Sequence, residues 1–388
     1  MRDAFRSKSL RQAGYSEGAV VTADTILDLH GDEHRERRRV ENRLFRREVF
    51  SYWEHQVLGD TITTTLGPFV DAGRGDLARI GYRSALSLTA TIAGIDHDPA
   101  DVAATERLYA IVKKFSEGAT IMHSTRDKDD VRAEVRDALA AFETQTFRPS
   151  IERRRVLVRQ ARAGQIEHDV LPKDVLTTLL LHDERLELAP DVVLREMCLY
   201  LQAGAHSTAN AFTHTVDDLL VWGADHPDDL ATARHDIAFV QRCMHESLRL
   251  NPASPVAYRS PVADTQLGDG TLLPENALIV LDLTAANRDP DVFGMAADRF
   301  DPHREIPDGI ARWGLSFGAG AHACIGAELD GGLEIDPERP RDEQLFGTVA
   351  VMVHAFLGAG GRQDPSEPPT LDPTSTRKHY SRYPVVFD

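Results

Sequence analysis

The chain has 388 residues, 42% hydrophobic and 27% charged, which is ordinary for a globular protein with a substantial core. Its formal net charge of −17 argues against nucleic acid as a general partner, and no apolar run is long enough for a signal peptide or a membrane span. The three cysteines, Cys198, Cys243 and Cys324, are too scattered for a disulfide framework or a structural zinc site. We therefore expect a cytoplasmic protein.

An arginine-rich segment, 34-HRERRRVENRLFRRE-48, is the first distinctive feature along the chain. It holds seven arginines in a protein that is otherwise acidic. One interpretation is a solvated helix face paired with its own glutamates. The other is a docking surface for an acidic partner, or a clamp for a buried anion. The residues alone leave both open.

Long helical patterns follow. Apolar residues at three- and four-residue spacing predict helix through 101–148, 151–163 and 191–222. The last of these, from Asp191 to about Trp222, would be about 48 Å long and would cross most of a domain of this size. Its centre, 203-AGAHST-208, has small and polar residues where a core helix prefers leucine. Either helices pack closely there, or a groove holds a ligand against the helix.

Beyond the long helix, the chain combines one more helix with a few strands. In 246-ESLR-249 a glutamate and an arginine lie on one helix face, where they can pair and hold a further arginine. Strand patterns are clearest in 256–283, around the turn 268-GDG-270. The segments 286-ANRDP-290 and 298-DRFDP-302 follow. A buried Glu–Arg–Arg cluster is costly without partners, so we expect it to lock a loop in place.

The stretch 317-FGAGAHACIG-326 surrounds Cys324 with glycines and leads toward a helical segment. Backbone N–H groups at a helix start favour thiolate over thiol. A nucleophilic thiolate would need a base and an oxyanion hole, and the neighbouring residues do not supply both. A metal-ligating thiolate under a flat, bulky cofactor explains the glycines better, because the backbone must approach such a ligand closely.

These motifs, in this order, resemble those of the cytochrome P-450 family of haem-thiolate monooxygenases. The similarity runs from about Leu10 to the C-terminus. FGAGAHACIG resembles the cysteine-ligand loop, AGAHST the oxygen-activating helix, ESLR the glutamate–arginine helix motif and DRFDP the arginine-bearing meander. The resemblance implies a mainly α fold, with a large helical domain, a long central helix and a small β-rich part. It also implies a single domain formed by residues 1–388.

The resemblance implies heme b (iron protoporphyrin IX) as the cofactor, with Cys324 as the axial ligand of its iron. The other cofactor-binding residues that it implies are Phe317, Gly320 and Gly326 near the sulfur, His34, Arg38, Arg259 and His322 at the propionates, and Ala203 on the distal side. Glu246, Arg249 and Arg299 would form the structural cluster. Ala203, Ser254 and Val256 would line the substrate pocket, together with the region near Thr374–Thr376. Arg35, Arg39 and Arg43 would face a redox partner.

The family's chemistry is the insertion of one oxygen atom from O2 into an organic substrate. Small and apolar pocket residues favour a small-to-medium hydrophobic molecule, with hydroxylation as the default outcome. No flavin or iron–sulfur module is appended, so the electrons would come from a ferredoxin or flavodoxin with an NAD(P)H-dependent reductase. Two alternatives stay open: a peroxide-driven oxygenase, and a non-catalytic haem-binding sensor or carrier. A zinc site on Cys324 and His322 is disfavoured, because no second ligand pair accompanies them.

The chain departs from the family pattern in three places. Where the family commonly has an acid and a threonine after Gly204, this chain has His206 and Ser207, followed by Thr208. We predict that the hydroxyls of Ser207 and Thr208 serve oxygen activation, and that His206 either passes protons or merely packs. His34 falls earlier than its family counterpart, so we expect the family's first helix and most of its first strands to be missing from this chain. Glycine and proline interrupt the helix after Cys324, which predicts an insertion at about 331–342.

Overall fold

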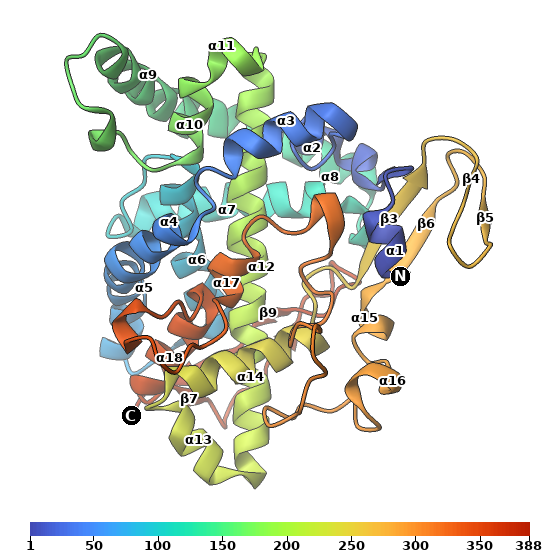
Figure 1. Cartoon of the computed structure of the whole chain (residues 1–388). Coiled ribbons are helices and arrows are strands. Elements are labelled where there is room, and N and C mark those ends of the chain that lie inside the picture. The colour runs from blue at the N-terminus through green and yellow to red at the C-terminus, as the bar shows by residue number, and fades with distance from the viewer. The chain divides into compact units, whose positions relative to one another are not determined.

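The computed structural model describes residues 1–388, and Figure 1 shows the order of their helices and strands. The chain forms two compact units. The first contains Met1–Arg11, Phe50–Ser84 and Ser207–Asp388, and the second contains Gln12–Val49 and Ala85–His206. Helices dominate and the strands are few and short, as predicted. None of the helices combines the length and the apolar character that crossing a bilayer requires.

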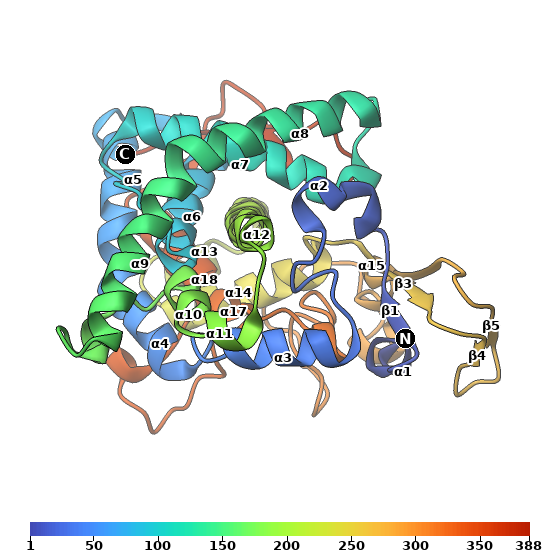
Figure 2. The same cartoon turned by 90° about the horizontal axis from the view of Figure 1, so that it is seen from above.

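The second unit is built almost entirely of helices. They are η1 (Tyr15–Gly18), α2 (Ala19–Thr22), α3 (Gly31–Glu41), α7 (Val102–Ala119), η3 (Ile121–His123), α8 (Lys128–Phe142), η4 (Glu143–Phe147), α9 (Arg148–Arg162), η5 (His168–Val170), α10 (Val175–Leu181) and α11 (Asp183–Leu186). The predicted helical region 101–148 is a hairpin of α7 and α8, which lie side by side in Figure 2. The chain reverses where the Asp127 carboxylate accepts from Asp129 N and Asp130 N and caps α8.

Three helices contain residues of both units: α4 (Arg47–Tyr52), α6 (Leu77–Ala93) and α12 (Pro190–Asp225). The prediction of one long helix is confirmed, since α12 has 36 residues and is seen along its axis in Figure 2. Its central glycine is explained by close packing against α6. A Cβ on Gly204 would lie 2.7 Å from Cγ2 and Oγ1 of Thr89.

The strands belong almost entirely to the first unit. They are β1 (Leu10–Gln12), β2 (Arg74–Asp76), β3 (Val256–Pro261), β4 (Thr265–Gln266), β5 (Leu272–Leu273), β6 (Ile279–Asp282), β7 (Arg362–Gln363), β8 (Thr370–Leu371), β9 (Tyr380–Arg382) and β10 (Pro384–Val386). They form two three-stranded sheets, β1-β3-β6 and β2-β10-β7, and two hairpins, β4-β5 and β8-β9. The β3–β6 pair is antiparallel with Tyr258 opposite Val280, so the predicted strand region 256–283 is confirmed.

The remaining helices of the first unit surround these sheets. They are α1 (Arg2–Arg6), η2 (Trp53–Leu58), α5 (Gly59–Asp71), α13 (Pro227–Ala233), α14 (Ile237–Leu250), α15 (Leu283–Ala286), α16 (Pro290–Phe293), η6 (Gly320–His322), α17 (Ala327–Gly331), η7 (Arg341–Glu343) and α18 (Thr348–Gly358). Of these, α14 packs against both α17 and α18. The helix that follows Cys324 is therefore anchored in the core of the first unit.

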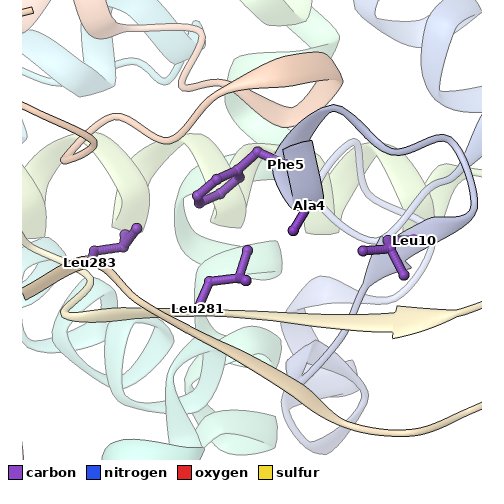
Figure 3. Packing of buried hydrophobic residues seen from close by; sticks show 5 residues of the cluster. All are labelled: Ala4, Phe5, Leu10, Leu281 and Leu283. Carbon is purple, nitrogen blue, oxygen red and sulfur yellow. The ribbon is translucent and has the colours of Figure 1, made fainter. Parts of the chain in front are cut away.

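A small apolar cluster joins the N-terminal helix α1 to the β1-β3-β6 sheet. Figure 3 shows its buried members, which are Ala4, Phe5, Leu10, Leu281 and Leu283. Leu315 and Ala319, from the segment that leads to Cys324, pack against the same cluster. The cysteine loop therefore rests on α1 and the sheet.

The helical segment after Cys324 is interrupted, as the glycines and prolines predict. Helix α17 ends at Gly331 and α18 begins at Thr348. Gly332 and Gly347 both have left-handed backbone (φ 72° and 91°), which glycine adopts at little cost. Within the segment that joins α17 to α18, Leu333 N donates to Leu345 O at 2.8 Å. The segment between these two residues is thus a loop whose ends are held together.

Candidate functional site

Cys324 is the one exposed cysteine of the chain. Cys198 and Cys243 are fully buried, and desolvation raises the pKa of both thiols above the ordinary value. A buried thiol of this kind is held in its neutral form, whereas metal ligation needs the thiolate. Of the three cysteines, only Cys324 is therefore suited to bind a metal ion that reaches it from outside the core.

The loop around Cys324 has an internal scaffold of its own. Cys324 N donates to Phe317 O at 2.8 Å, which closes the loop into a compact turn. The Phe317 ring contacts Trp313 edge-on, with ring centroids 5.3 Å apart. Phe317 thus supports the cysteine through its carbonyl as well as its ring.

Glycine is present at positions 320 and 326 of the loop for two different physical reasons. Gly320 has φ 73°, and a Cβ there would overlap the carbonyl oxygen of Phe5 in α1. Gly326 has φ −92°, which any residue adopts, and the nearest protein atom to a Cβ there is Cys324 Sγ at 4.0 Å. The chain's own packing requires Gly320, whereas the space beside Gly326 is left open next to the sulfur.

Asn287, from the predicted 286-ANRDP-290 segment, fixes the beginning of the cysteine loop. Its side chain is fully buried; Oδ1 accepts from Leu315 N at 2.7 Å and Nδ2 donates to Ser316 Oγ at 2.9 Å. Ser316 Oγ in turn donates to Leu248 O at 2.7 Å. The sequence analysis did not assign this role to Asn287, although the segment stood out.

A buried ion cluster holds Asn287 in turn. Arg249 Nη2 donates to Glu246 Oε1 at 2.6 Å, and Arg249 Nη1 donates to the carbonyls of Asn287 and Ala297, both at 2.6 Å. Arg249 is fully buried, and Glu246 is 4% exposed. The expectation that this cluster locks a loop is met, because the chain of contacts runs from Glu246 through Arg249 and Asn287 to the cysteine loop.

The third member of the cluster is Arg304, and the prediction of Arg299 is wrong. Arg304 Nε donates to Glu246 Oε1 at 3.0 Å, and its side chain is buried. Arg299 is exposed, and only its carbonyl takes part, accepting from Arg249 Nη2 and Arg304 Nη2. Two turns explain this arrangement, one closed by Arg299 N to Ala296 O and one by Arg304 N to Asp301 O, because they leave the Arg299 side chain at the surface and turn Arg304 toward Glu246.

Two further predicted cofactor contacts lie in the first unit. Arg259, in β3, is 3% exposed; its guanidinium lies over the Phe5 ring at 5.0 Å and donates to Tyr258 O at 2.8 Å. His322 ends η6, just before Cys324. Both are therefore held by the α1 and loop region that carries the cysteine.

The second unit carries the other predicted cofactor contacts, His34 and Arg38, on one face of α3. His34 is buried, and desolvation, aided by the charge of Arg38, lowers its pKa to about 4. It is thus neutral near pH 7. Arg38 is half-buried, and its Nε donates to Asn42 Oδ1 at 3.0 Å.

The other arginines of the segment 34–48 fall into two groups: some belong to a solvated helix face, and one binds a buried anion. Arg35 and Arg39 are exposed and pair with Asp32 and Glu36 of the same helix, which is the solvated-face interpretation. Arg43 is also exposed, and its Nη1 lies 2.5 Å from His182 Nε2.

Arg37 instead clamps a buried anion. It is 6% exposed, and its Nη1 donates to Glu196 Oε2 of α12 at 2.6 Å. Nearby in the same unit, Tyr200 OH donates to Glu41 Oε2 at 2.6 Å. Burial raises the pKa of Glu196 to about 7, and burial with the repulsion of Glu196 raises the pKa of Glu41 well above its ordinary value. The sequence analysis did not predict these contacts, because Glu196 and Tyr200 are far in sequence from the arginine-rich segment 34–48.

The centre of α12 has one accessible face. Ala203 is exposed, and Ser207 and Asn210, four and seven positions further on and so on the same face, are partly exposed. His206 is also partly exposed. Thr208 is 4% exposed and its Oγ1 donates to the carboxyl of Asp330. An accessible alanine in the middle of a long helix is unusual, and it fits a face reserved for a ligand.

The remaining predicted pocket residues lie at the start of β3. Ser254 is exposed in the turn before the strand, and Val256 is partly exposed within it. No contact of either residue distinguishes a substrate role from an ordinary turn.

The donor set fits the haem that the sequence resemblance implies. No group of three or more histidine, cysteine or acidic side chains gathers to hold a bare metal ion. A cysteine thiolate is a ligand that suits haem iron. The open space beside Gly326 and the accessible Cys324 thiol provide for close approach of such a group to the loop.

Comparison with known proteins agrees with this geometry. A family model described as cytochrome P450 matches residues 220–329, the part that carries the Glu246 cluster and the Cys324 loop. The cytochrome P450 monooxygenase PikC of Streptomyces venezuelae is 32% identical over 170 residues, which are 44% of this chain and 38% of that protein. Pulcherriminic acid synthase of Bacillus subtilis is 25% identical over 336 residues, which are 84% of this chain and 74% of that protein.

The fold is shared more widely than the sequence. The crystal structure of CalO2 covers this whole chain with a TM-score of 0.74 at 20% identity, and 88% of CalO2 is matched. Sequence matches with the first of the curated relatives, PikC included, span about two fifths of the relative's length.

Proposed function

We propose that this chain, a member of the cytochrome P450 family with bacterial relatives, is a haem-thiolate monooxygenase. It would insert one oxygen atom from O2 into a hydrophobic organic substrate, with hydroxylation as the default outcome. In the balanced reaction the substrate, O2, two electrons and two protons give the hydroxylated product and water. The observation that carries the proposal is the single exposed cysteine, in a loop that a buried ion cluster holds through Asn287.

The proposed roles of the cofactor-binding residues follow from their chemistry. Cys324 supplies the thiolate that ligates the iron of haem b, and the open space beside Gly326 admits the macrocycle. Arg38 and Arg259 supply positive charge for the propionates, and His34 and His322 supply hydrogen bonds. Because His34 is neutral near pH 7, it would act as a hydrogen-bond donor rather than as a charge.

Haem ligated by a thiolate supplies O2 activation and O–O cleavage when it is bound. The chain's own residues orient the substrate and deliver the protons. Ser207, on the accessible face of α12, is the hydroxyl placed to hold a proton there, and His206 is the adjacent group able to exchange one with solvent. Ala203 keeps this face of the helix free of bulk, whereas Gly204 lets α12 pack closely against α6.

The finer features of the proposal concern substrate, partners and setting. Ala203, Ser254 and Val256 favour a small-to-medium substrate with little charge. Electrons would come from a ferredoxin or flavodoxin with an NAD(P)H-dependent reductase, and exposed Arg35, Arg39 and Arg43 suit an acidic partner. A reducing cytoplasm suits Cys324, which must remain unoxidised to bind the iron. The proposal also treats residues 1–388 as one domain with an insertion at about 331–342.

The test is the carbon monoxide difference spectrum of the dithionite-reduced, haem-loaded protein. A red-shifted Soret band, the signature of thiolate-ligated ferrous haem, is expected for the wild type and for the control Cys243→Ala, which alters a buried cysteine. Cys324→Ser is expected to lose that band. A wild-type protein that binds no haem, or that keeps the band without Cys324, would contradict the proposal.

A further inference from the structure

A half-buried carboxyl lies against the centre of α12, although no acidic residue is present there in the sequence. Asp330 belongs to α17, the short helix that follows the Cys324 loop. Both of its carboxyl oxygens lie 3.0 Å from Oγ1 of Thr208. Thr208 is directly adjacent to Ser207 in α12 and is 4% exposed. The fold therefore forms an acid–hydroxyl pair from two helices that are far apart in sequence.

The backbone of α17 is held on every side by other elements of the first unit. Nε2 of His245 in α14 lies 2.6 Å from Gly331 O, and Thr348 Oγ1 of α18 donates to Leu329 O at 3.2 Å. Glu54 of η2 accepts from Phe346 N and Gly347 N, just before α18. The contacts of His245 and Thr348 use the main chain of α17, so its Asp330 side chain is left to contact α12.

No cation faces the Asp330 carboxyl. Burial is the main cause that raises its pKa, from the ordinary 3.8 to about 7, and only the hydrogen bond from Thr208 opposes the rise. Among the neighbouring titratable groups, burial lowers the pKa of His245 to about 4, so that its ring is neutral, and burial raises the pKa of Glu54. Asp330 is thus a neutral acid below about pH 7.

We propose that Asp330 is a positioning residue of the oxygenase site: its carboxyl accepts a hydrogen bond from Thr208 Oγ1 and ties the helix that follows the Cys324 loop to the centre of α12, beside Ser207. This inference rests on the proposed function for the role of that site. Once ionised, Asp330 still accepts from Thr208, but it becomes a desolvated charge without a counter-ion. The cost of this charge destabilises the packing of α17 against α12 as pH rises.

The first experiment uses infrared titration of the full chain and needs no cofactor. Burial raises the pKa of Glu196 and Asp218 to about 7 as well, so the readout is the difference between the wild type and Asp330→Asn. The wild type is expected to show one further carboxylic-acid C=O component that disappears as pH rises through about 7, and Asp330→Asn is expected to lack that component. Thr208→Val removes the bond that stabilises the ionised form, so the same band is expected to persist to higher pH. A wild-type spectrum without an Asp330-dependent band in this range overturns the proposal.

The second experiment asks whether the pair acts on the cysteine loop. In the haem-loaded protein, the fraction of the carbon monoxide complex with the red-shifted band is expected to fall as pH rises through about 7. The profile is expected to be flat in Asp330→Asn, whose amide oxygen still accepts from Thr208 and which carries no titrating group. Glu328→Gln, an exposed acid on the same helix, is the matched control and should follow the wild type.

The outcomes separate the two proposals. If the red-shifted band is absent from every protein, including the wild type, the proposed function fails, and with it the positioning role. If the band is present and wild type and Asp330→Asn have identical pH profiles, only the positioning role fails. If Asp330→Ala loses the band at all pH values and Asp330→Asn retains it, the hydrogen bond is confirmed as the link.

Discussion

Arg249 Nη1 donates to the carbonyl of Asn287 at 2.6 Å, and this bond connects the ion cluster to the loop that carries Cys324. Asn287 then uses both ends of its amide on that loop, at Leu315 N and Ser316 Oγ. The cluster and the loop thus form one continuous hydrogen-bonded unit, and a change in the cluster is transmitted to the cysteine through Asn287.

We expect Arg304→Ala to lower the free energy of unfolding by about 3–5 kcal/mol, since it leaves Glu246 short of a buried partner. The matched control is Arg299→Ala, which removes an exposed side chain and should cost no more than about 0.5 kcal/mol. The measurement is the free energy of unfolding of the two variants and the wild type in urea. Equal losses would mean that Arg299 does share the role.

Asn287→Ala is expected to loosen the cysteine loop without removing the ion cluster. Three polar groups lose a partner, at about 1–3 kcal/mol each if they stay buried, although water will satisfy some of them. The readout is the rate at which Cys324 reacts with Ellman's reagent in the haem-free protein, which should rise. An unchanged rate, in a variant that remains folded, would show that the loop keeps its shape without Asn287.

The same reagent distinguishes the three cysteines. In the native haem-free protein one thiol should react fast and two slowly, because Cys198 and Cys243 are buried and only Cys324 is exposed. Loading with haem should protect the fast thiol, and Cys324→Ser should abolish it. A fast thiol that persists in Cys324→Ser would contradict the assignment of the accessible cysteine.

Gly320→Ala is expected to lower the stability of the protein, and Gly326→Ala is expected to weaken haem binding. At Gly320 an alanine must adopt φ 73° and collides with the Phe5 carbonyl, so we expect a loss of stability of at least about 1–2 kcal/mol. At Gly326 the backbone suits alanine and the nearest protein atom is 4.0 Å away. Stability there should be nearly unchanged, while haem binding weakens, and chemical unfolding together with haem titration measures both.

The pair Glu41 and Glu196 predicts a pH-dependent stability in the second unit. Both carboxyls have their pKa raised above the ordinary 4.5, that of Glu196 to about 7. A raised carboxyl pKa means that the folded state holds protons more tightly, so stability falls as pH rises from about 4.5 through 7. Glu41→Gln should therefore be more stable than the wild type at pH 8, by about 1–3 kcal/mol, and similar to it near pH 4.

The measurement for this pair is urea unfolding at both pH values. Glu36→Gln, at a more exposed acid of the same helix that pairs with surface arginines, serves as the control and should show no such pH dependence. A Glu41→Gln variant that is less stable than the wild type at pH 8 would show that the ionised form of Glu41 is stabilised by its surroundings after all.

Local pattern was enough to predict α12, the strands of 256–283 and the interruption after Cys324, because periodicity, turns and glycines act over a few residues. It failed at Arg299, where two arginines lie close in sequence and the turn between them decides which one faces inward. It also could not predict the Thr208–Asp330 or Arg37–Glu196 bonds. These join residues far apart in the chain, and only tertiary packing brings them together.

The loop between Leu333 and Leu345 has a consequence for protein engineering. Gln241 Nε2 lies within 3.0–3.4 Å of the carbonyls of Gly331, Leu333, Leu345 and Phe346, so one buried amide holds both ends of the loop. Gln344 in addition bonds to the backbone of Asp336 and Arg339 inside the loop. Because Gln241 fixes the ends, we expect that the exposed residues 340–343, which lie outside these bonds, can change in length without altering where α18 starts. This loop is a natural place to graft an affinity peptide or an electron-donor module.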